Sequence, residues 1–349
     1  MKKNVKALAL FSGGLDSALA IKLITNQGIE VIALNFVSHF FGGKNEKAEA
    51  MARQLGVKLE YVDFSEKHIE MMKNPVYGRG KNMNPCIDCH ALMFKFAGEL
   101  LEKYGADFLI SGEVLGQRPM SQNYQALEKV KGLSKLEDLI IRPLSAKLLP
   151  PSKAELEGLV DREQLLDIEG RSRKRQIEIA EQMGIEDYPT PAGGCLLTDP
   201  GYSKRLKLIE EDGLLSEENA DIFHLLKKGR FFRFEKGKYL FVGRMKEDND
   251  EIVKYKNAGR FFIRGKGVGG PYILGYGELS EEQTEFAKNL FSRYCKFKGD
   301  QPIEIFFNEE PVPVDVINKE KVEENIKKYQ ITMESVSYTH LTLPTKLEV

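Results

Sequence analysis

Short apolar runs alternate with longer amphipathic segments in the first half of the chain. The apolar runs occupy residues 5–10, 31–36, 57–62 and 108–110, and the helical segments between them include 17–25 and 46–55. Gly56 follows the second of these segments and is expected to end that helix. Strands separated by helices imply right-handed crossovers, so we expect an α/β domain built on a parallel sheet.

Polar segments follow three of these predicted strands. They are residues 12–17, Asn35 and 111–113. In a parallel sheet, ligands bind beyond the carboxyl ends of the strands, so these segments should meet at one edge. Their convergence predicts a nucleotide site.

The loop after the first strand has the composition of a phosphate cradle and reads Phe11-Ser12-Gly13-Gly14-Leu15-Asp16-Ser17. Glycines let the backbone approach an oxyanion, and the N–H groups of the loop and of the following helix point toward it. No lysine follows the glycines, which excludes the GxxxxGK[ST] loop of most NTPases. The alternative is an ordinary glycine-rich turn.

Three cysteines form a second candidate site. Cys86 and Cys89 make a CxxC pair, and Cys195 follows 106 positions after Cys89. A CxxC pair can hold a metal or act as a redox pair, and a third distant thiolate would leave one position of a four-coordinate centre open. The alternative is buried thiols without a shared role. Exposed loops are expected from the neighbouring residues Pro85, Gly193 and Gly194, whereas Cys295 has no such setting and is expected to be structural.

Composition narrows the class of protein. The chain has 349 residues, 42% hydrophobic and 30% charged, with a net charge of −1, which suits two or three soluble domains without a global attraction to nucleic acid. No apolar stretch approaches a membrane span, so no membrane partner is expected. Four cysteines are too few for a secreted disulfide framework, which favours the cytoplasm.

Two later segments are basic. Residues 227–266 hold thirteen Lys and Arg against five Asp and Glu, with interleaved aromatic residues. Strands with one positive face could neutralise phosphates and stack bases, although most of these aromatic residues are better explained as a domain core. Residues 171–175 precede a predicted helix over 177–183. They could contact RNA phosphate or AMP, or they could form a solvated face.

The motifs together resemble a known family. Ser12–Ser17 resembles the signature of the PP-loop ATP pyrophosphatases, the adenine nucleotide alpha-hydrolase-like superfamily. With the segment Asn84-Pro85-Cys86-Ile87-Asp88-Cys89-His90, the strand ending at Glu113 and the late Cys195, residues 4–210 resemble the tRNA thiouridine synthases. The 2-thiouridylases are similar in pattern, with the 4-thiouridine synthases nearby. His90 departs from the asparagine usual in 2-thiouridylases, which leaves the target uridine open.

The resemblance implies a reaction and a set of site residues. The family uses ATP to adenylate a uridine carbonyl oxygen and then replaces that oxygen with sulfur. Pyrophosphate and Mg²⁺ would be held by the loop residues Ser12, Gly13, Gly14, Asp16 and Ser17, with Phe11 and Leu15 completing the cradle. The adenosine would be lined by Asn35, Phe36 and Gly112. The expected partners are tRNA and a sulfur donor, which is sulfide, a cysteine desulfurase or a sulfur carrier.

The three cysteines imply one of two mechanisms. Family members with all three hold a [4Fe–4S] cluster, so Cys86, Cys89 and Cys195 would be its ligands, and the expected catalytic residues are Asp16, Cys89 and Cys195. The alternative is a persulfide mechanism that uses Cys89 and Cys195, with Cys86 a bystander.

A second resemblance covers the C-terminal part. Residues 242–245, followed by Asp248, Asn249 and Asp250, resemble the RNA-binding domain of the NFACT family. We therefore expect a thiolation domain over 1–210, with a helical insert at about 150–185 that begins with a helix over 153–165. A smaller α+β RNA-binding domain is expected over 211–331. Residues 332–349 resemble a translated library-adapter sequence and are left out of the fold prediction.

The sequence thus predicts a cytoplasmic ATP-dependent tRNA sulfurtransferase. One alternative is a PP-loop amidotransferase or ligase that adenylates a small carboxylate. Such an enzyme needs neither the three cysteines nor a basic C-terminal domain. Another alternative is a non-catalytic RNA-binding protein that only senses ATP, which would not require the intact loop with Asp16.

Overall fold

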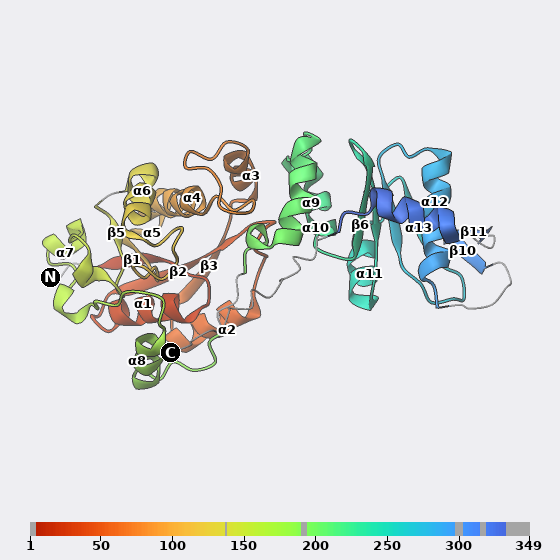
Figure 1. The fold of residues 1–349 in the computed structure, drawn as a ribbon. Helices are drawn as coiled ribbons and strands as arrows, with labels where there is room; N and C mark the ends of the chain where they lie inside the picture. The colour runs from red at the N-terminus through yellow and green to blue at the C-terminus, as the bar shows by residue number, and fades with distance from the viewer. Residues whose placement is uncertain (1–4, 137, 190–193, 297–302, 315–318, 333–349) are drawn as a thin grey trace, which may run out of the picture. The chain divides into compact units, whose positions relative to one another are not determined.

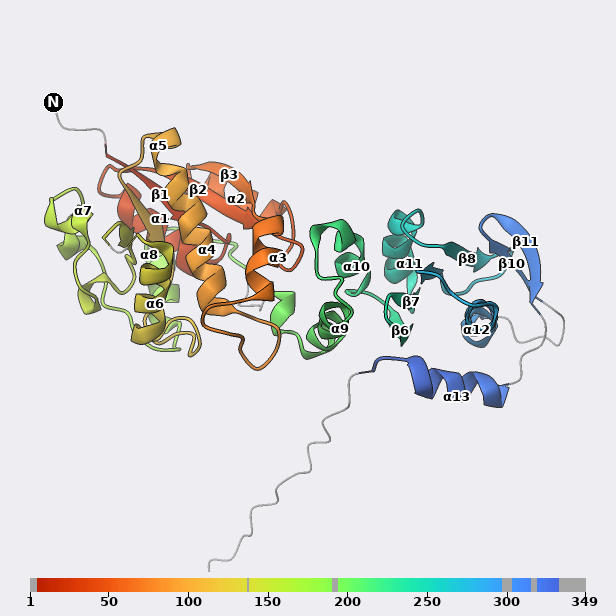
Figure 2. The same cartoon turned by 90° about the horizontal axis from the view of Figure 1, so that it is seen from above.

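The computed structural model describes residues 5–136, 138–189, 194–296, 303–314 and 319–332. The chain divides into two compact units (Figures 1 and 2). The first unit comprises Met1–Asp199 and Gly213–His224, and the second comprises Pro200–Asp212 and Leu225–Val349. Within the described ranges, the helices are too short or too polar to cross a bilayer.

A five-stranded parallel sheet forms the centre of the first unit, which confirms the predicted α/β class. The strand order is β3-β2-β1-β4-β5, and each neighbouring pair runs parallel. The strands are β1 (Lys6–Leu10), β2 (Glu30–Val37), β3 (Lys58–Asp63), β4 (Phe108–Ser111) and β5 (Ile140–Ile141).

Helices cover both faces of this sheet (Figure 1). Ala7 and Ala9 of β1 belong to the core formed with α1, whereas Leu8 between them belongs to the core formed with α4, as the two-residue period of a strand requires. One face carries α1 (Leu15–Thr25), α2 (Glu46–Leu55) and α8 (Lys174–Gln182). The other carries α3 (Ser65–Lys73), α4 (Cys86–Glu99), α5 (Leu101–Tyr104) and α6 (Tyr124–Ser134).

Local signals set the ends of several helices. Asn45 caps the start of α2, and Gly56 ends it in the left-handed conformation with φ 68°, as predicted. The predicted helix over 153–165 is wrong. Only α7 (Lys153–Leu156) forms, because Gly158 adopts φ 70° directly after it, and a short 3₁₀ turn (Arg162–Gln164) follows. The helix predicted over 177–183 forms as α8.

The second unit contains a six-stranded antiparallel sheet with the order β11-β10-β8-β9-β7-β6, which confirms the α+β class. Phe286 and Phe291 of α12 and Val322 of α13 pack on one face of the sheet. The strands are β6 (Arg230–Glu235), β7 (Lys238–Val242), β8 (Phe261–Gly265), β9 (Ile273–Tyr276), β10 (Ile303–Phe307) and β11 (Glu310–Val314). The helices are α9 (Pro200–Glu211), α11 (Lys246–Ile252), α12 (Glu281–Tyr294) and α13 (Lys319–Tyr329), and α10 (Ala220–Leu225) spans a boundary between the units.

Candidate active site and nucleic-acid surface

The loop between β1 and α1 can be built only with glycine at position 13. Gly13 has φ +78°, and a Cβ there would lie 2.8 Å from Cα and 2.9 Å from Cβ of Ala48 in α2. Gly14 precedes α1 in an extended conformation and provides no side-chain cap for the helix. The N–H groups of the first turn of α1 are therefore left for another acceptor, the arrangement in which helix N-termini bind anions.

The other loop residues divide between backbone support and possible ligand contact. The Ser17 hydroxyl donates to the carbonyl oxygen of Gly14 at 2.9 Å and lies 3.5 Å from the Ser12 hydroxyl, so these two side chains shape the loop. Phe11 and Leu15 are 3% and 1% exposed, so they anchor the loop in the core and present only their backbone to a ligand.

Asp16 stands at the centre of a polar cluster drawn from three segments. One carboxylate oxygen, Oδ2, accepts a hydrogen bond from Gln117 Nε2 at 2.9 Å. The other, Oδ1, is 3.8 Å from Arg173 Nη2, too far for a hydrogen bond. Asp16 Oδ1, Gln117 Oε1 and Arg173 Nε are buried and have no hydrogen-bond partner among the described residues. Buried polar groups are rarely left unpaired, so three around one carboxylate mark the place where a polar ligand would bind.

The basic segment 171–175 was predicted either to contact a ligand or to form a solvated face, and different arginines of the segment fit each interpretation. Arg173 lies at the start of α8 and reaches Asp16, whereas Arg175 forms an exposed ion pair with Asp167 at 2.6 Å. Arg173 therefore belongs to the cluster around Asp16, and Arg175 belongs to a solvated face.

The residues predicted to line adenosine have other contacts in this structure. The Asn35 amide is buried and donates to the carbonyl oxygen of Phe11 at 2.9 Å, and Phe36 packs edge-on against Phe64. Gly112 lies against the start of α1, where a Cβ would be 2.4 Å from Ser17 N. Asn35 and Gly112 thus hold the nucleotide loop in place, and a contact with adenosine stays a prediction for all three.

The three cysteines approach one another from two distant segments. Cys86 is the first residue of α4, Cys89 follows one turn later, and Cys195 caps a 3₁₀ turn (Leu196–Thr198). Burial raises the pKa of the Cys89 thiol well above its usual range, and the charges of Cys195 and Cys86 raise it further. Burial likewise raises the pKa of Cys195, with Cys86 adding to the effect and the Arg118 guanidinium opposing it.

The surroundings of the thiols differ from the prediction. Cys86 and Cys89 lie in a helix and not in an exposed loop, because Pro85 takes the position directly before the first turn of α4. Gly193 falls outside the described residues, whereas Gly194, next to Cys195, is exposed as predicted. Cys295 lies in the second unit, half-buried at the end of α12, with its thiol 3.3 Å from the carbonyl oxygen of Ser292.

The three thiols have the donor chemistry of an iron–sulfur site. Thiolates are the ligands that iron–sulfur clusters use, and these three are near enough for their charges to interact. Within the described part of the chain, however, no three His, Cys, Asp or Glu side chains are placed to hold a metal ion. Three thiolates are suitable ligands for a cluster, but the thiols would have to move closer together to hold one.

A buried charge network lies beside Cys89. Glu113 Oε1 is 2.7 Å from His90 Nδ1, and Glu113 Oε2 accepts from Arg142 Nε at 2.8 Å and from the Ser111 hydroxyl at 3.1 Å. Burial raises the pKa of Glu113, but Arg142 and His90 outweigh it and hold the pKa at about 2. The carboxylate is therefore charged, and it fixes the ring of His90 directly after Cys89. From the sequence, Glu113 was expected at this edge of the parallel sheet, but no sequence pattern predicts its contacts with His90 and Arg142.

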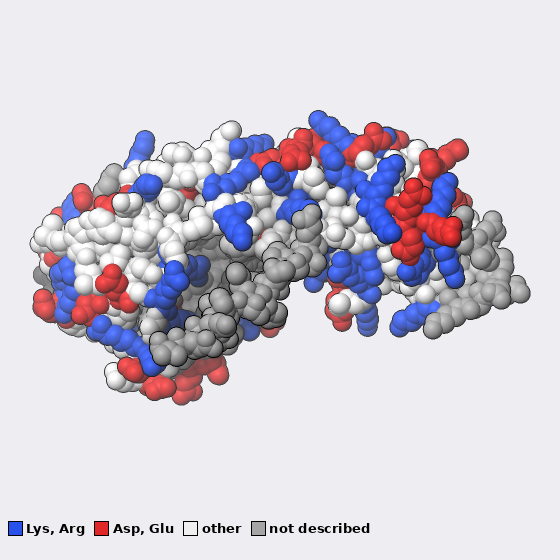
Figure 3. All heavy atoms as spheres, viewed as in Figure 1, with Lys and Arg blue, Asp and Glu red and all other residues white. Residues whose placement is uncertain are grey.

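The basic character of the second unit is partly offset by acidic residues. Lys and Arg side chains alternate with Asp and Glu over the part that holds α12 and α13 (Figure 3). Arg264 of β8 pairs with Glu309, and Lys266, directly after β8, pairs with Glu304 at 2.9 Å. Carboxylates of β10 and of the turn after it therefore compensate these cations. The aromatic residues are core, as preferred from the sequence, since the buried set includes Phe231, Phe232, Tyr239, Phe241, Phe261 and Phe262.

One basic turn remains directed to solvent. Arg244, Met245 and Lys246 are exposed, and the buried Asp248 holds the turn by accepting from Arg244 N at 3.0 Å. A Cβ at Gly243 would lie 2.0 Å from Asn249 Oδ1. These contacts explain why the segment resembling the NFACT domain has Gly243, Asp248 and Asn249 at these positions.

Other arginines gather near this turn. The Arg230 guanidinium lies 4.0 Å from the centre of the Tyr294 ring. Burial lowers the pKa of Arg230, and the charges of Arg244 and Arg293 lower it further although Tyr294 opposes the shift. We call Arg230, Arg244, Met245, Lys246 and Arg293 the arginine patch.

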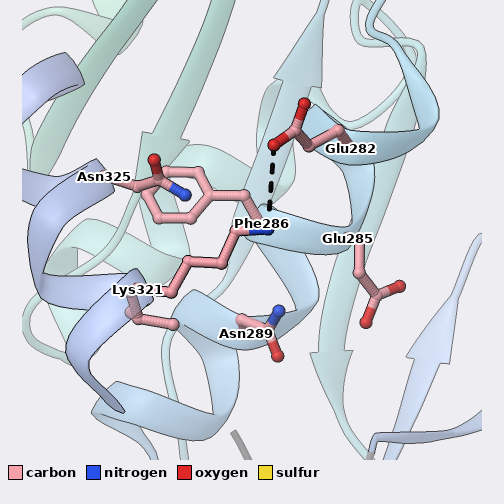
Figure 4. A pocket seen from close by; sticks show the side chains of 7 residues that line it. Glu282, Glu285, Phe286, Asn289, Lys321 and Asn325 are labelled. Atoms are coloured by element: carbon pink, nitrogen blue, oxygen red, sulfur yellow. Dashed lines mark ion pairs between the residues drawn. The ribbon is translucent and has the colours of Figure 1, made fainter. Parts of the chain in front are cut away.

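A small pocket between α12 and α13 has a different character (Figure 4). Its volume is about 90 Å³, and Glu282 and Glu285 are among its lining residues. Lys321 is 3.9 Å from Glu282 and Lys288 is 3.1 Å from Glu285, so both carboxylates are paired with lysines. A pocket this small with two carboxylates does not suit a nucleotide, and we assign it no ligand.

Comparisons with known proteins agree with the motifs. Residues 3–148 match the family model described as thiamine biosynthesis protein (ThiI), and residues 229–330 match the model described as NFACT protein RNA binding domain. Both predicted resemblances are thereby confirmed. The chain carries a ThiI-like PP-loop segment and an NFACT-type segment.

Curated relatives match over part of their length. A probable tRNA sulfurtransferase of Thermococcus kodakarensis is 33% identical over 40% of this chain and 36% of the relative. A tRNA-specific 2-thiouridylase MnmA of Sulfurimonas denitrificans is 32% identical over 44% of this chain and 48% of the relative. The chain thus spans between a third and a half of the length of these relatives. A solved 4-thiouridine synthetase–RNA complex with bound ATP is 18% identical, covers 64% of this chain and 52% of that chain, and has a TM-score of 0.38, too low to carry an argument.

Proposed function

We propose that this protein is an ATP-dependent tRNA sulfurtransferase that replaces a uridine carbonyl oxygen with sulfur. The observation that carries the proposal is the set of buried, unpaired polar atoms around Asp16, next to the uncapped N-terminus of α1. The three thiols lie in the same unit, and the polar residues that follow β4 connect the two regions. The named activities of the two relatives support this assignment.

The nucleotide step follows from the chain's own groups. The N–H groups of the first turn of α1 and the Arg173 guanidinium would bind the β- and γ-phosphates of ATP. Asp16 Oδ1 lacks a hydrogen-bond partner within the described part of the chain and is the oxygen we assign to Mg²⁺, while Gln117 keeps the carboxylate oriented through Oδ2. The uridine oxygen attacks the α-phosphorus, a new O–P bond forms, and pyrophosphate leaves toward the positive end of α1.

Sulfur transfer completes the reaction. Sulfide attacks the activated carbon of the uridine, and the C–O bond breaks with release of AMP. Cys86, Cys89 and Cys195 would hold a [4Fe–4S] cluster, which would supply a Lewis acid for the sulfide. In the persulfide alternative, one of Cys89 and Cys195 would receive the outer sulfur of a donor protein's persulfide. That sulfur attacks the uridine carbon, the other cysteine breaks the S–S bond, and the two thiols finish as a disulfide that a thiol reductant must reopen.

The arginine patch is the part of the second unit that we assign to tRNA. Its cations would neutralise backbone phosphates, and the Tyr294 ring holds one guanidinium in place. Both tRNA and ATP are cytoplasmic, so we place the protein there. The sulfur donor would be sulfide, a cysteine desulfurase or a sulfur carrier.

Two measurements test this function. tRNA-dependent exchange of labelled pyrophosphate into ATP is expected, because the adenylated base forms only when tRNA is present. Nucleoside analysis of tRNA from cells with and without the protein should reveal one thiouridine that disappears in its absence. Exchange without tRNA, stimulated by a small carboxylate, would instead indicate a ligase.

Iron content decides between the two sulfur mechanisms. Anaerobically prepared protein should be brown and contain about four iron atoms per chain. Alanine at Cys86, Cys89 or Cys195 should remove the iron, whereas Cys295→Ala, in the second unit, should retain it. Colourless protein that thiolates tRNA and tolerates Cys86→Ala would support the persulfide mechanism.

A further inference from the structure

Large apolar side chains are exposed on the segments that border Cys86. Val76 is 70% exposed, Tyr77 42%, Met120 44% and Tyr124 49%. They belong to the loop before α4, the loop before α6 and the first residue of α6, and α3, α4 and α6 lie side by side in both views (Figures 1 and 2). A group of exposed apolar side chains of this kind marks an interaction surface.

A buried carboxylate fixes this surface. Asp88 is 2% exposed, and it accepts hydrogen bonds from Val76 N at 2.6 Å and from Tyr77 N at 3.1 Å. Because Asp88 stands between Cys86 and Cys89, the turn that carries Tyr77 is tied to the same helical turn as two of the thiols. Tyr77 is thus held in an exposed position by a rigid backbone, which reduces the ordering cost of binding.

Met120 extends the surface toward both reaction centres. A Cβ on Gly80 would lie 2.7 Å from the sulfur of Met120, so the loop before α4 and the loop before α6 are in close contact. Asn84 Nδ2 is 3.8 Å from that sulfur and 3.2 Å from Cys86 Sγ. Gln117 of the Met120 loop binds Asp16 at 2.9 Å. A ligand on this surface would therefore lie beside the thiols and near the nucleotide loop.

The chemistry of the surface favours a nucleobase. The Lys129 ammonium lies over the Tyr77 ring, 4.9 Å from its centre, and both side chains are exposed. An aromatic ring with an adjacent cation suits a stacked base and its phosphate, since base–aromatic stacking works for every base. We propose that Tyr77 stacks on an unpaired base of the tRNA substrate next to the target uridine, with Met120 packing beside it and Lys129 on the adjoining phosphate. This inference rests on the proposed function and names the part of the first unit that receives the RNA.

The test compares tyrosine variants of the full-length protein. Binding of unthiolated tRNA and the rate of thiolation with free sulfide are measured for wild type, Tyr77→Ala and Tyr77→Phe. Loss of one stacked base weakens binding by about tenfold or more. We therefore expect Tyr77→Ala to lose that much affinity and Tyr77→Phe to stay within about twofold of wild type, because stacking needs the ring and not the hydroxyl. Leu156→Ala is the control, since Leu156 is 74% exposed on α7 at the other end of the unit.

The outcomes separate this inference from the function on which it rests. Unchanged tRNA affinity in Tyr77→Ala, with normal thiolation by wild type, would overturn the inference and leave the proposed function intact. Equal losses in the alanine and phenylalanine variants would also overturn it, because the hydroxyl would then be the contact. A defect seen only when a protein donor replaces sulfide would reassign the surface to that donor. Failure of wild type to bind tRNA would refute both.

Discussion

Replacing Gly112 with alanine should damage the nucleotide site from a position that contributes no side chain to it. The new Cβ would lie 2.4 Å from Ser17 N, 2.5 Å from Asp16 C and 2.7 Å from Asp16 O, whereas ordinary contacts begin at 3.4 Å. All three neighbours are backbone atoms at the start of α1, so no flexible side chain can move aside. The end of β4 and the first turn of α1 must separate by about 1 Å to accept the methyl group.

That displacement has two measurable effects. Overpacking of this kind costs about 1–3 kcal/mol of unfolding free energy, which lowers the Tm of the first unit by several degrees at about 2–4 °C per kcal/mol. A shift of about 1 Å in a site that holds phosphates can reduce turnover by about 100-fold. We expect Gly112→Ala to lose tRNA-dependent ATP–pyrophosphate exchange on that scale while the far-UV circular dichroism spectrum stays unchanged.

Gly132→Ala supplies the matched control. Gly132 lies in α6, and a Cβ there would meet no atom within 4 Å. The same substitution should therefore raise stability by about 0.5–1 kcal/mol, since alanine is the better helix former, and leave exchange unchanged. Wild-type exchange and Tm in Gly112→Ala would refute the close packing between β4 and α1.

Three further predictions concern charge. Asp16→Asn should reduce exchange by about 100-fold or more through loss of the Mg²⁺ ligand, yet calorimetry in EDTA should show tighter pyrophosphate binding because one negative charge is gone. Arg244→Ala combined with Lys246→Ala should weaken tRNA binding and reduce the slope of log K against log salt by about 1–2, whereas Lys254→Ala, which removes a lysine paired with Glu251, should leave it unchanged. Burial and the charge of His39 lower the pKa of His68 to about 3. Below about pH 6.5 the unfolded chain therefore binds a proton at His68 that the folded state does not bind. The free energy of unfolding should fall from about pH 6.5 downward, by about 2 kcal/mol at pH 5, and its pH profile should be flatter in His68→Phe.

The parallel sheet of the first unit could be predicted because its signals are local. Apolar runs of strand length, helical spacing and Gly56 each depend on a few neighbouring residues, and β1, β2, β3 and β4 form where those runs lie. The helix predicted over 153–165 failed for a local reason. Gly158 takes a left-handed conformation that ends α7 after one turn, and the hydrophobic spacing after Gly158 does not indicate that the helix ends there.

The site was predictable only at the level of segments. Parallel strands bring their carboxyl ends to one edge, which is sufficient to place Asp16 near the residues that follow β4. The partners of individual side chains depend on tertiary packing, so neither the Gln117 bond to Asp16 nor the Arg142 bond to Glu113 has a sequence signal. Charge counting over residues 227–266 overstated the free cations, because the compensating Glu304 and Glu309 lie beyond that window.

The contact between Asp16 and Arg173 explains how the nucleotide loop could be anion-free in one state and anion-bound in the next. At 3.8 Å the pair has Coulomb attraction without a hydrogen bond, and the residues that the structure describes offer neither Asp16 Oδ1 nor Arg173 Nε a hydrogen-bond partner. A bidentate pair would be costly to separate, whereas this one leaves each partner able to accept a better ligand. In the proposed function, Mg²⁺–ATP would supply both at once, a cation for the carboxylate and phosphate oxygens for the guanidinium. Gln117 binds the other oxygen, Oδ2, and would keep the carboxylate oriented while its ionic partner changes. The same loop carries Met120, whose sulfur lies 3.8 Å from the Asn84 amide that also contacts Cys86. The residue that orients Asp16 and the residue that borders this amide are therefore three positions apart on one short segment.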